Sequence, residues 1–269
     1  MSGYSGSSGK DRWPSVKAAI KAGKSSTAHK RISNCVPKTL QWTSLFNQYR
    51  KDIPLAFMVV KAAFESCGKA DALTKSGKDI GLFQLFPIHF ERNGLTPTQG
   101  LDPANNTRIF VKVLDGRAAS FEKSHGSWFP NGRDWSFWGI MWLTAGIGPG
   151  ATRHLLNQVS QGPGAFNKIV SFVSSHPGWM EEYAQDAKWG VQSGRLVAFR
   201  VMVAWDVVGE IRKLEASGEL EEYVTQPVPG VPRGGDLGRI FGITLAVLGS
   251  ASSAALVGWT AYQGLRRKR

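Results

Sequence analysis

From about residue 40 onward, the pattern of hydrophobic and polar positions is typical of helices and predicts a compact fold. Asp52 and Pro54 suit the start of a helix, because a short acceptor can cap the first N–H groups and proline is tolerated in the first turn. The run LAFMVVKAAFES that follows is apolar enough for a buried helix, and Gly68 stands where such a helix should end. The pattern therefore predicts a buried helix with Glu65 in its last turn.

The composition divides the chain into further segments. Residues 1–40 are rich in Ser, Gly and Lys, which predicts a flexible basic arm with one short helix near Val16–Ala22. Residues 41–216 form the predicted folded domain. Residues 217–238 place proline and glycine between charges, as a linker does.

A long uncharged stretch follows the predicted linker. Residues 239–265 carry no charge after the first position, and about 20 apolar residues are enough to cross a bilayer as a helix. Trp259 and Tyr262 stand near one end, where interfacial aromatic residues belong, and a basic tail at 266–269 comes next. We therefore expect a transmembrane helix, in contact with the lipid bilayer through residues 240–262, and a single-pass membrane protein.

Small residues recur at every fourth position of this stretch, which lines one face of a helix with small side chains. The recurring positions are Gly242, Ala246, Ser250, Ala254 and Gly258. Such a face lets membrane helices approach closely and predicts a helix–helix partner, although small residues are also common in weak anchors.

The net charge of +13 is unevenly distributed. Basic residues dominate residues 1–50, where Asp11 is the one acid, and residues 266–269 are all basic. The part between is nearly neutral, so the charge belongs to the two ends of the chain. Such ends either contact nucleic acid, anionic lipid or a wall polymer, or are simply solvated.

Cys35 and Cys67 match no metal-binding or redox motif. They form a disulfide if the chain reaches an oxidising compartment and otherwise remain two thiols, and the sequence leaves both alternatives open. The histidines lack metal-ligand spacing, so no metal is expected, and no phosphate-binding loop or other cofactor motif occurs. The first residues contain no apolar run of the kind found in a secretory signal peptide.

The predicted position of Glu65 has a chemical consequence. A carboxylate at the end of a helix faces the negative end of the helix dipole, which disfavours ionisation, and apolar neighbours act in the same direction by desolvation. A glutamic acid held protonated near neutral pH is what a glycosidase needs to protonate a leaving oxygen. The alternative is an ordinary exposed glutamate at a helix end.

Several motifs follow Glu65 in a fixed order. They are Glu65–Ser66, Gly81–Leu85, Asp102–Asn106, Ala145–Gly150 and Tyr183. Together they resemble the lytic transglycosylase family of the lysozyme superfamily, over about residues 40–190. The resemblance implies a mainly α, lysozyme-like domain with a small β excursion, to which the sequence adds the one C-terminal transmembrane helix.

The resemblance also implies a reaction. Glu65 would donate a proton to the oxygen between MurNAc and GlcNAc in peptidoglycan, and would then take the proton of the MurNAc 6-hydroxyl. A 1,6-anhydro ring would close, with no water and no second carboxylate required. This intramolecular attack gains from proximity.

Substrate-binding roles follow from the same resemblance. Ser66 would orient the reacting groups, and Phe83 and Gln84 would line the cleft. Gly146 and Gly148 would let the backbone approach the glycan closely. These residues, together with a late tyrosine at Tyr183, complete the expected site.

The sequence departs from the family in two places. Leu143 and Thr144 stand where the family has Tyr-Asn, so the usual partner of the glutamate is missing and either Tyr183 replaces it or activity is low. Asp71 and Asp79 lie in the segment where goose-type lysozymes carry acids that position a water. One of them would then act as a second carboxylate for hydrolysis, unless both only support the loop.

A cluster of aromatic residues precedes the glycine segment. Trp138 and Trp142 lie one helical turn apart and are expected in the core. Trp128 and Trp135 are the better candidates for contact with sugar rings.

The resulting hypothesis is a membrane-anchored peptidoglycan lytic transglycosylase. An anchor without an export signal fits the lytic enzymes of membrane-containing phages, which places the protein in a virion, within an internal membrane or ejected with the genome, and acting in the bacterial periplasm during genome entry. One alternative is a goose-type-like muramidase, which hydrolyses the same bond. The other is a non-catalytic structural protein of a virion or membrane on a lysozyme-like scaffold, which Leu143 favours.

Overall fold

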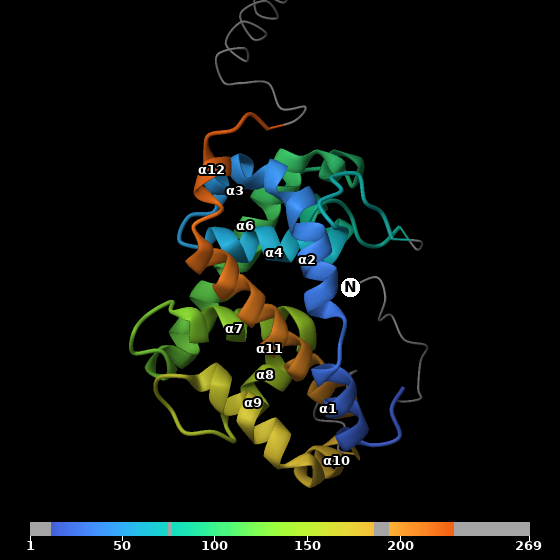
Figure 1. Cartoon of the computed structure of the whole chain (residues 1–269), viewed down its shortest axis with the longest axis vertical. Coiled ribbons are helices and arrows are strands. Elements are labelled where there is room, and N and C mark those ends of the chain that lie inside the picture. The colour runs from blue at the N-terminus through green and yellow to red at the C-terminus, as the bar shows by residue number, and fades with distance from the viewer. Residues whose placement is uncertain (1–11, 75–76, 186–193, 229–269) are drawn as a thin grey trace, which may run out of the picture. The chain divides into compact units, whose positions relative to one another are not determined.

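Helices form the regular structure of the part of the chain that the structure describes (Figure 1). The computed structural model describes residues 12–74, 77–185 and 194–228, and the described residues up to Gln226 belong to one compact unit. The helices are α1 (Val16–Lys24), α2 (Ala28–Thr39), η1 (Leu40–Trp42), α3 (Thr43–Tyr49), α4 (Leu55–Ser66), α5 (Pro87–Glu91), η2 (Thr98–Leu101), α6 (Pro103–His125), η3 (Gly126–Trp128), α7 (Trp135–Ile147), α8 (Pro149–Leu156), α9 (Ala165–Ser175), α10 (Pro177–Gln185), α11 (Gly194–Ser217) and α12 (Glu221–Val224). The mainly helical part of the predicted fold class is confirmed.

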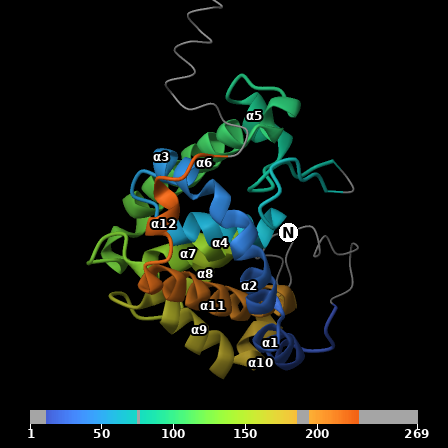
Figure 2. The ribbon, with the colours of Figure 1, turned by 45° about the horizontal axis from the view of Figure 1, so that its top comes forward.

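Helix α4 is buried along most of its length and packs against α2, α3 and α11 (Figures 1 and 2). It ends at Cys67, which adopts a left-handed conformation with φ of 57°. The predicted helix, its end and the position of Glu65 in the last turn are thus confirmed. The predicted capping role of Asp52 is wrong, because Pro54 precedes the first helical residue and the Asp52 carboxylate pairs with Arg133 at 2.9 Å.

Residues 16–39, predicted as part of a flexible arm with one short helix near Val16–Ala22, contain two packed helices, α1 and α2. Val16 and Ala19 are completely buried and Ile20 nearly so, and α1 packs along α11. Ser15 caps α1 by accepting a hydrogen bond from the N–H of Ala18 (3.2 Å). The predicted short helix is therefore confirmed as α1, but the predicted flexibility is wrong, because the few apolar residues of α1 fall on one helical face and are enough to bury it.

The predicted linker also begins with ordered structure. Helix α12 packs against α3, and Leu220 just before it is 6% exposed. The remainder of the linker, from residue 229, lies outside the described residues.

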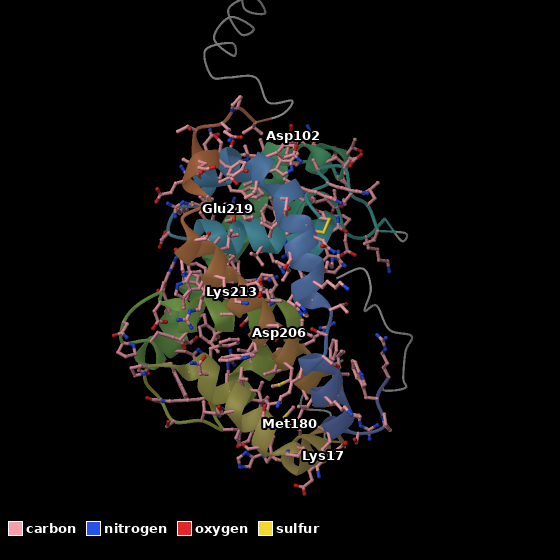
Figure 3. All side chains as sticks on the ribbon, viewed as in Figure 1. Lys17, Asp102, Met180, Asp206, Lys213 and Glu219 are labelled. Atoms are coloured by element: carbon pink, nitrogen blue, oxygen red, sulfur yellow. A yellow bond between two sulfur atoms is a disulfide. The ribbon has the colours of Figure 1, made fainter. Side chains whose placement is uncertain are left out.

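A disulfide joins Cys35 on α2 to Cys67 at the end of α4, with their Cα atoms 4.8 Å apart (Figure 3). The sequence left this pairing open. A cross-link between residues 32 positions apart stabilises a fold by about 3–4 kcal/mol through the unfolded state. The indole N–H of Trp42 donates to the carbonyl of Gly68 (2.8 Å) and holds the same point. The end of α4, and with it Glu65, is therefore fixed from two sides.

The segment between α4 and α5 contains isolated antiparallel bridges, from Leu73 to Ile80 and from Ile80 to Leu85. No strand occurs in the described part of the chain, so the predicted small β excursion is wrong. The reason is local, because Gly81 and Gln84 have φ values of 74° and 48° and turn the backbone out of the extended conformation.

Asn106 on α6 holds this irregular segment in place. Its side chain is completely buried: Oδ1 accepts from the N–H of Phe83, and Nδ2 donates to the carbonyls of Ile80 and Gly100, all at 2.9 Å. A Cβ at Gly81 would lie 2.2 Å from Nδ2 of Asn106, so this close approach requires glycine. The start of α6 also follows the prediction, since Asp102 caps it by accepting from the N–H of Asn105 (2.8 Å).

Replacing Asn106 by alanine is expected to lower the free energy of unfolding by about 3 kcal/mol, because three buried polar groups lose their partners. Urea denaturation measures the change. Asn105→Ala is the matched control. That amide is half-exposed, donates to the carbonyl of Gln99 (3.2 Å) and accepts from the exposed Arg108 (3.3 Å), so its loss should cost less than about 1 kcal/mol. Equal losses in the two variants would refute the role given to Asn106.

No helix in the described residues is both long enough and apolar enough to span a membrane. Helix α11 has the length, at 24 residues, but carries Arg200, Asp206 and Glu210 within it. This finding corrects the prediction of a transmembrane helix and of a single-pass membrane location. The stretch 239–265, on which the predicted bilayer contact and helix–helix partner depended, lies outside the described residues.

Candidate active site

Glu65 forms a buried ion pair with a residue of its own helix. Lys61 lies one turn earlier on α4, and its Nζ is 2.6 Å from Oε1 of Glu65. The spacing of four residues places both side chains on one face of the helix. Glu65 is 7% and Lys61 9% exposed, so the pair is largely withdrawn from solvent.

Opposing effects act on the pKa of Glu65. Burial raises the pKa, because desolvation disfavours the charged form, whereas attraction to the Lys61 ammonium and its hydrogen bond lower it. The net result is a pKa below the ordinary value for glutamate. The sequence predicted the opposite direction, because it considered the helix dipole and desolvation but not the lysine.

Two arginines add to the positive environment of Glu65. Arg31 on α2 donates from Nη2 to the backbone carbonyl of Glu65 (3.2 Å), and its guanidinium lies over the ring of Phe64. Arg200 on α11 is close enough to attract the Glu65 carboxylate, while burial lowers the pKa of this arginine. Arg200 also donates a hydrogen bond to the carbonyl of Gly146. Cations from three helices therefore surround the end of α4.

A small cavity separates α4, α7 and α11 beside this pair. Its volume of about 30 Å³ accommodates roughly two water molecules. Lys61 and Phe64 line it from α4, Trp142 and Leu143 from α7, and Arg200 from α11. The Lys61 ammonium lies 4.6 Å from the centre of the Trp142 ring, so the cation is held between an aromatic face and a carboxylate.

Phe83 and Gln84, which were predicted to line a cleft after α4, respectively pack in the core and hold the loop together. Phe83 is 2% exposed and stacks on Phe110, with ring centres 3.9 Å apart, so the structure places it in the core. The Nε2 of Gln84 donates to the carbonyls of Ala72 (3.0 Å) and Gly81 (2.8 Å) and thereby closes the loop.

Ser66 is buried next to Glu65, and its hydroxyl donates to the carbonyl of Ala62 one turn earlier (3.2 Å). The structure thus brings Ser66 to the site, and its predicted role in orienting the reacting groups stays a prediction.

Residues 43–133 match the family model of the transglycosylase SLT domain. We call these residues the SLT domain. Members of the family are lytic transglycosylases, which cleave peptidoglycan, so the match supports a lytic transglycosylase of the lysozyme-like superfamily. The matched residues include Glu65, Gly81–Leu85 and Asp102–Asn106, whose order suggested the resemblance. No curated relative matches the chain.

The glycine segment lies beyond the matched part of the SLT domain, and the structure changes its description. Helix α7 continues through Gly146 to Ile147, Gly148 turns the chain with φ of 85°, and α8 begins at Pro149. The segment is therefore a tight junction between two helices and not an extended loop. A Cβ on Gly148 would meet no atom within 4 Å, so its backbone conformation, not a neighbour, requires glycine. Close approach of a glycan to Gly146 and Gly148 stays a prediction.

Leu143 is 1% exposed and forms an apolar wall where the family has a tyrosine. Tyr183 belongs to α10, but its side chain lies outside the described ones, so its support of Glu65 stays a prediction. Among the described residues, Lys61 donates a hydrogen bond to the Glu65 carboxylate.

The candidate second carboxylates lie in the loop of the SLT domain. Asp71 is exposed and Asp79 is half-buried. The backbone of Asp79 is paired with Thr74 in both directions, at 3.1 and 3.2 Å, which is a turn-stabilising contact. Their role in activating water stays a prediction. Within the described part of the chain, no cluster of three or more His, Cys, Asp or Glu side chains is arranged to hold a metal ion.

The aromatic cluster before the glycine segment divides into two groups. Trp138 and Trp142 are 2% and 7% exposed, which confirms that they belong to the core. Trp128, expected to contact sugar, is also buried at 7%. Trp135 at the start of α7 is half-buried and accessible.

The sequence did not predict the cations around Glu65, of which Lys61 and Arg200 act on its carboxylate. Lys61 could have been found, because positions four apart on a predicted helix share a face. Arg200 could not, because nothing in its local sequence indicates that α11 packs beside α4.

Proposed function

We propose that the SLT domain cleaves the bond between MurNAc and GlcNAc by intramolecular transglycosylation and leaves 1,6-anhydro-MurNAc ends. The supporting observation is the charge around Glu65: in the described part of the chain, the side chains found to act on its carboxylate are the cations Lys61 and Arg200. Glycosidases that use water hold a second carboxylate about 5–10 Å from the first. Attack by the sugar's own hydroxyl needs only one acid–base group.

The reaction follows a balanced proton cycle at Glu65. The protonated carboxyl donates to the glycosidic oxygen as the bond from C1 of MurNAc breaks. The carboxylate then takes the proton of the 6-hydroxyl while the hydroxyl oxygen bonds to C1, which returns Glu65 to its starting form. Lys61 favours the first step, because its cation stabilises the carboxylate that forms.

Burial sets a condition on this cycle. At 7% exposure, the carboxylate is not open to a polymer, so glycan binding must displace part of its cover. The cover includes α11, whose Arg200 reaches the junction at Gly146.

The products of purified peptidoglycan test the proposal. Released muropeptides are expected to be lighter by one water than hydrolysis products and to resist borohydride reduction, as mass spectrometry will show. Reducing MurNAc ends would overturn the proposal and favour the goose-type hydrolase.

The two loop acids provide the matched test of that alternative. Asp71→Asn and Asp79→Asn are each expected to leave the identity of the product unchanged. If the enzyme instead hydrolyses the bond, loss of activity in one of these two variants would identify that aspartate as the second carboxylate. Absence of any product from the wild-type chain would favour a non-catalytic scaffold.

A role in a phage particle was inferred from the membrane anchor, so the present proposal concerns the reaction alone.

A further inference from the structure

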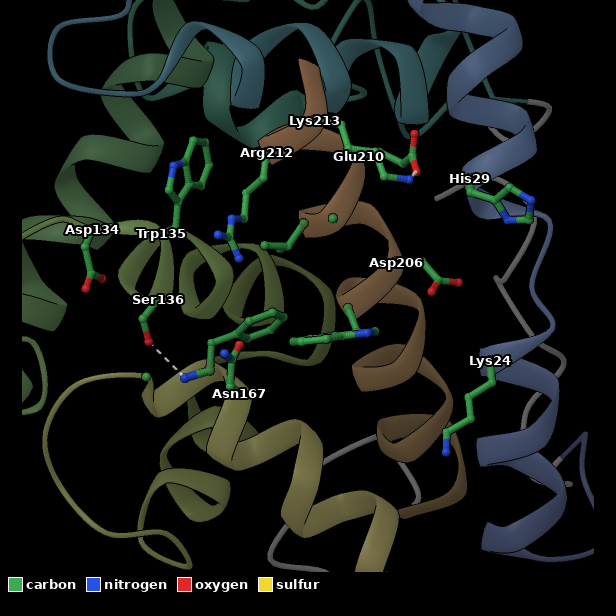
Figure 4. A pocket seen from close by; sticks show the side chains of 15 residues that line it. Lys24, His29, Asp134, Trp135, Ser136, Asn167, Asp206, Glu210, Arg212 and Lys213 are labelled. Carbon is green, nitrogen blue, oxygen red and sulfur yellow. Dashed lines mark hydrogen bonds and ion pairs between the residues drawn. The ribbon is translucent and has the colours of Figure 1, made fainter. Parts of the chain in front are cut away.

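An open groove of about 740 Å³ lies beside α11 (Figure 4). None of the α11 residues that line it lines the cavity between α4, α7 and α11. We call this open groove the α11 groove and define it by Trp135, Asn167, Trp205, Gly209 and Arg212. Its volume is in the range of pockets that bind small ligands or a few units of a polymer. Side chains from α1, α2, α7, α9 and α11 surround it.

An exposed indole ring is the main apolar feature of the α11 groove. Trp205 is 45% exposed, although a tryptophan on a packed helix is usually well buried. Phe166 supports the ring from below, with centres 6.1 Å apart, and the N–H of Phe166 is held by the hydroxyl of Ser136 (3.0 Å). The indole is therefore presented on a fixed support.

Gly209 keeps the surface next to this ring open. It lies one turn after Trp205, and a Cβ there would meet no atom within 4 Å. Glycine inside a helix costs about 1 kcal/mol relative to alanine, and here no neighbour requires it. Side chains on a helix lean toward the preceding turn, so any larger residue at this position would cover Trp205.

Polar groups around the indole complement a sugar polymer. Asn167 and the half-buried carboxylate of Asp206 supply hydrogen-bonding groups for hydroxyl and amide groups, and Arg212 and Lys24 supply cations (Figure 4). The C–H faces of sugar rings pack on aromatic faces. The carboxylates of MurNAc lactyl groups and peptide stems suit a guanidinium or ammonium. Asp134 and Glu210 also line the groove, so its charge is mixed, which suits the carboxylate and ammonium groups of peptide stems better than a neutral glycan.

We propose that the α11 groove is a second peptidoglycan-binding site, which holds one stretch of glycan while the SLT domain cuts another. The proposal relies on the proposed function only for peptidoglycan as the polymer. It does not depend on whether the products carry anhydro or reducing ends.

Binding to purified peptidoglycan sacculi tests this site, with Glu65→Gln in every chain to prevent cleavage. Depletion of protein from suspension gives the Kd. Adding Trp205→Ala is expected to raise the Kd about fivefold to tenfold, whereas Trp205→Phe, which keeps a flat ring, should stay within about twofold. Trp179→Ala on α10, a half-buried tryptophan outside the groove, is the matched control and should bind as the parent does.

Gly209→Leu separates binding from folding. This change is expected to raise the melting temperature, because leucine favours helix, and yet to weaken sacculus binding as much as Trp205→Ala. With active Glu65, Trp205→Ala should cleave a soluble tetrasaccharide, too short to occupy both sites, at the wild-type rate.

Unchanged Kd values for both Trp205→Ala and Gly209→Leu would overturn the proposal. So would a parallel fall in tetrasaccharide cleavage, which would assign the groove to the catalytic site itself. Failure of the proposed function would give a different result. Digestion by the wild-type chain would then leave reducing ends, while Trp205→Ala and Gly209→Leu would still raise the Kd.

Discussion

Glu65→Gln is expected to lower the rate of peptidoglycan cleavage by about 100- to 10,000-fold, the range over which a positioned acid–base group contributes. Glutamine has nearly the same shape as glutamate and can still accept a hydrogen bond from Lys61. It has no acidic proton to donate and no carboxylate to take the proton of the 6-hydroxyl. Chromatography of muropeptides released from purified sacculi measures the loss.

The control for this variant removes a carboxylate elsewhere in the SLT domain. Glu91→Gln changes an exposed residue of α5 and is expected to keep wild-type activity. A melting curve for Glu65→Gln shows that the fold is intact. Wild-type activity in Glu65→Gln would mean that another group is the acid, and inactivity of both the variant and the wild type would favour the scaffold without catalysis.

The part of the site that sequence could predict depends on local signals. The apolar run before Glu65 defines α4, and the break at Cys67 follows from where that run ends. Asp102 and Pro103 likewise start α6 through contacts within one turn. Such features need no knowledge of the partner helices, which is why they were predicted correctly.

The features that sequence missed depend on tertiary contacts. Phe83 is apolar whether it lines a cleft or fills a core, and only the position of Phe110 decides that it is buried. Helix α1 was predicted as a short helix but placed in a flexible arm, because its burial depends on α11, which begins only at Gly194. The pKa of Glu65 was predicted in the wrong direction for a simpler reason: Lys61 is local, but its charge was not weighed against desolvation.

Lys61→Met is expected to extend activity to higher pH. The first step needs protonated Glu65, so the rate falls as pH rises through the pKa of that residue. The Lys61 ammonium lowers this pKa by attraction and by its hydrogen bond, whereas desolvation raises it. Removing Lys61 takes away this lowering effect while the desolvation remains, so the alkaline limb of the pH–rate profile should move to higher pH.

Two comparisons make the pH shift specific to the ion pair. Lys61→Arg keeps the cation and is expected to keep the wild-type limb. Lys69→Met removes an exposed lysine close to the end of α4 and should leave the profile unchanged. An unmoved limb in Lys61→Met would show that Lys61 only packs against Trp142 and does not set the acidity of Glu65.

At neutral pH, Lys61→Met should lower the free energy of unfolding while it raises activity. Because the folded-state pKa of Glu65 is lowered, its pairing stabilises the fold above the pKa of the unfolded chain, and this contribution is lost as pH falls through the folded-state pKa. Lys61→Met should therefore be less stable than wild type at neutral pH, with the difference narrowing on acidification, as urea denaturation at several pH values will measure. Wild-type Glu65 becomes a competent acid over the same pH interval in which its ion pair stops stabilising the domain. Lys61 thus links the protonation that starts the reaction to the loosening of the contact that covers the catalytic carboxyl.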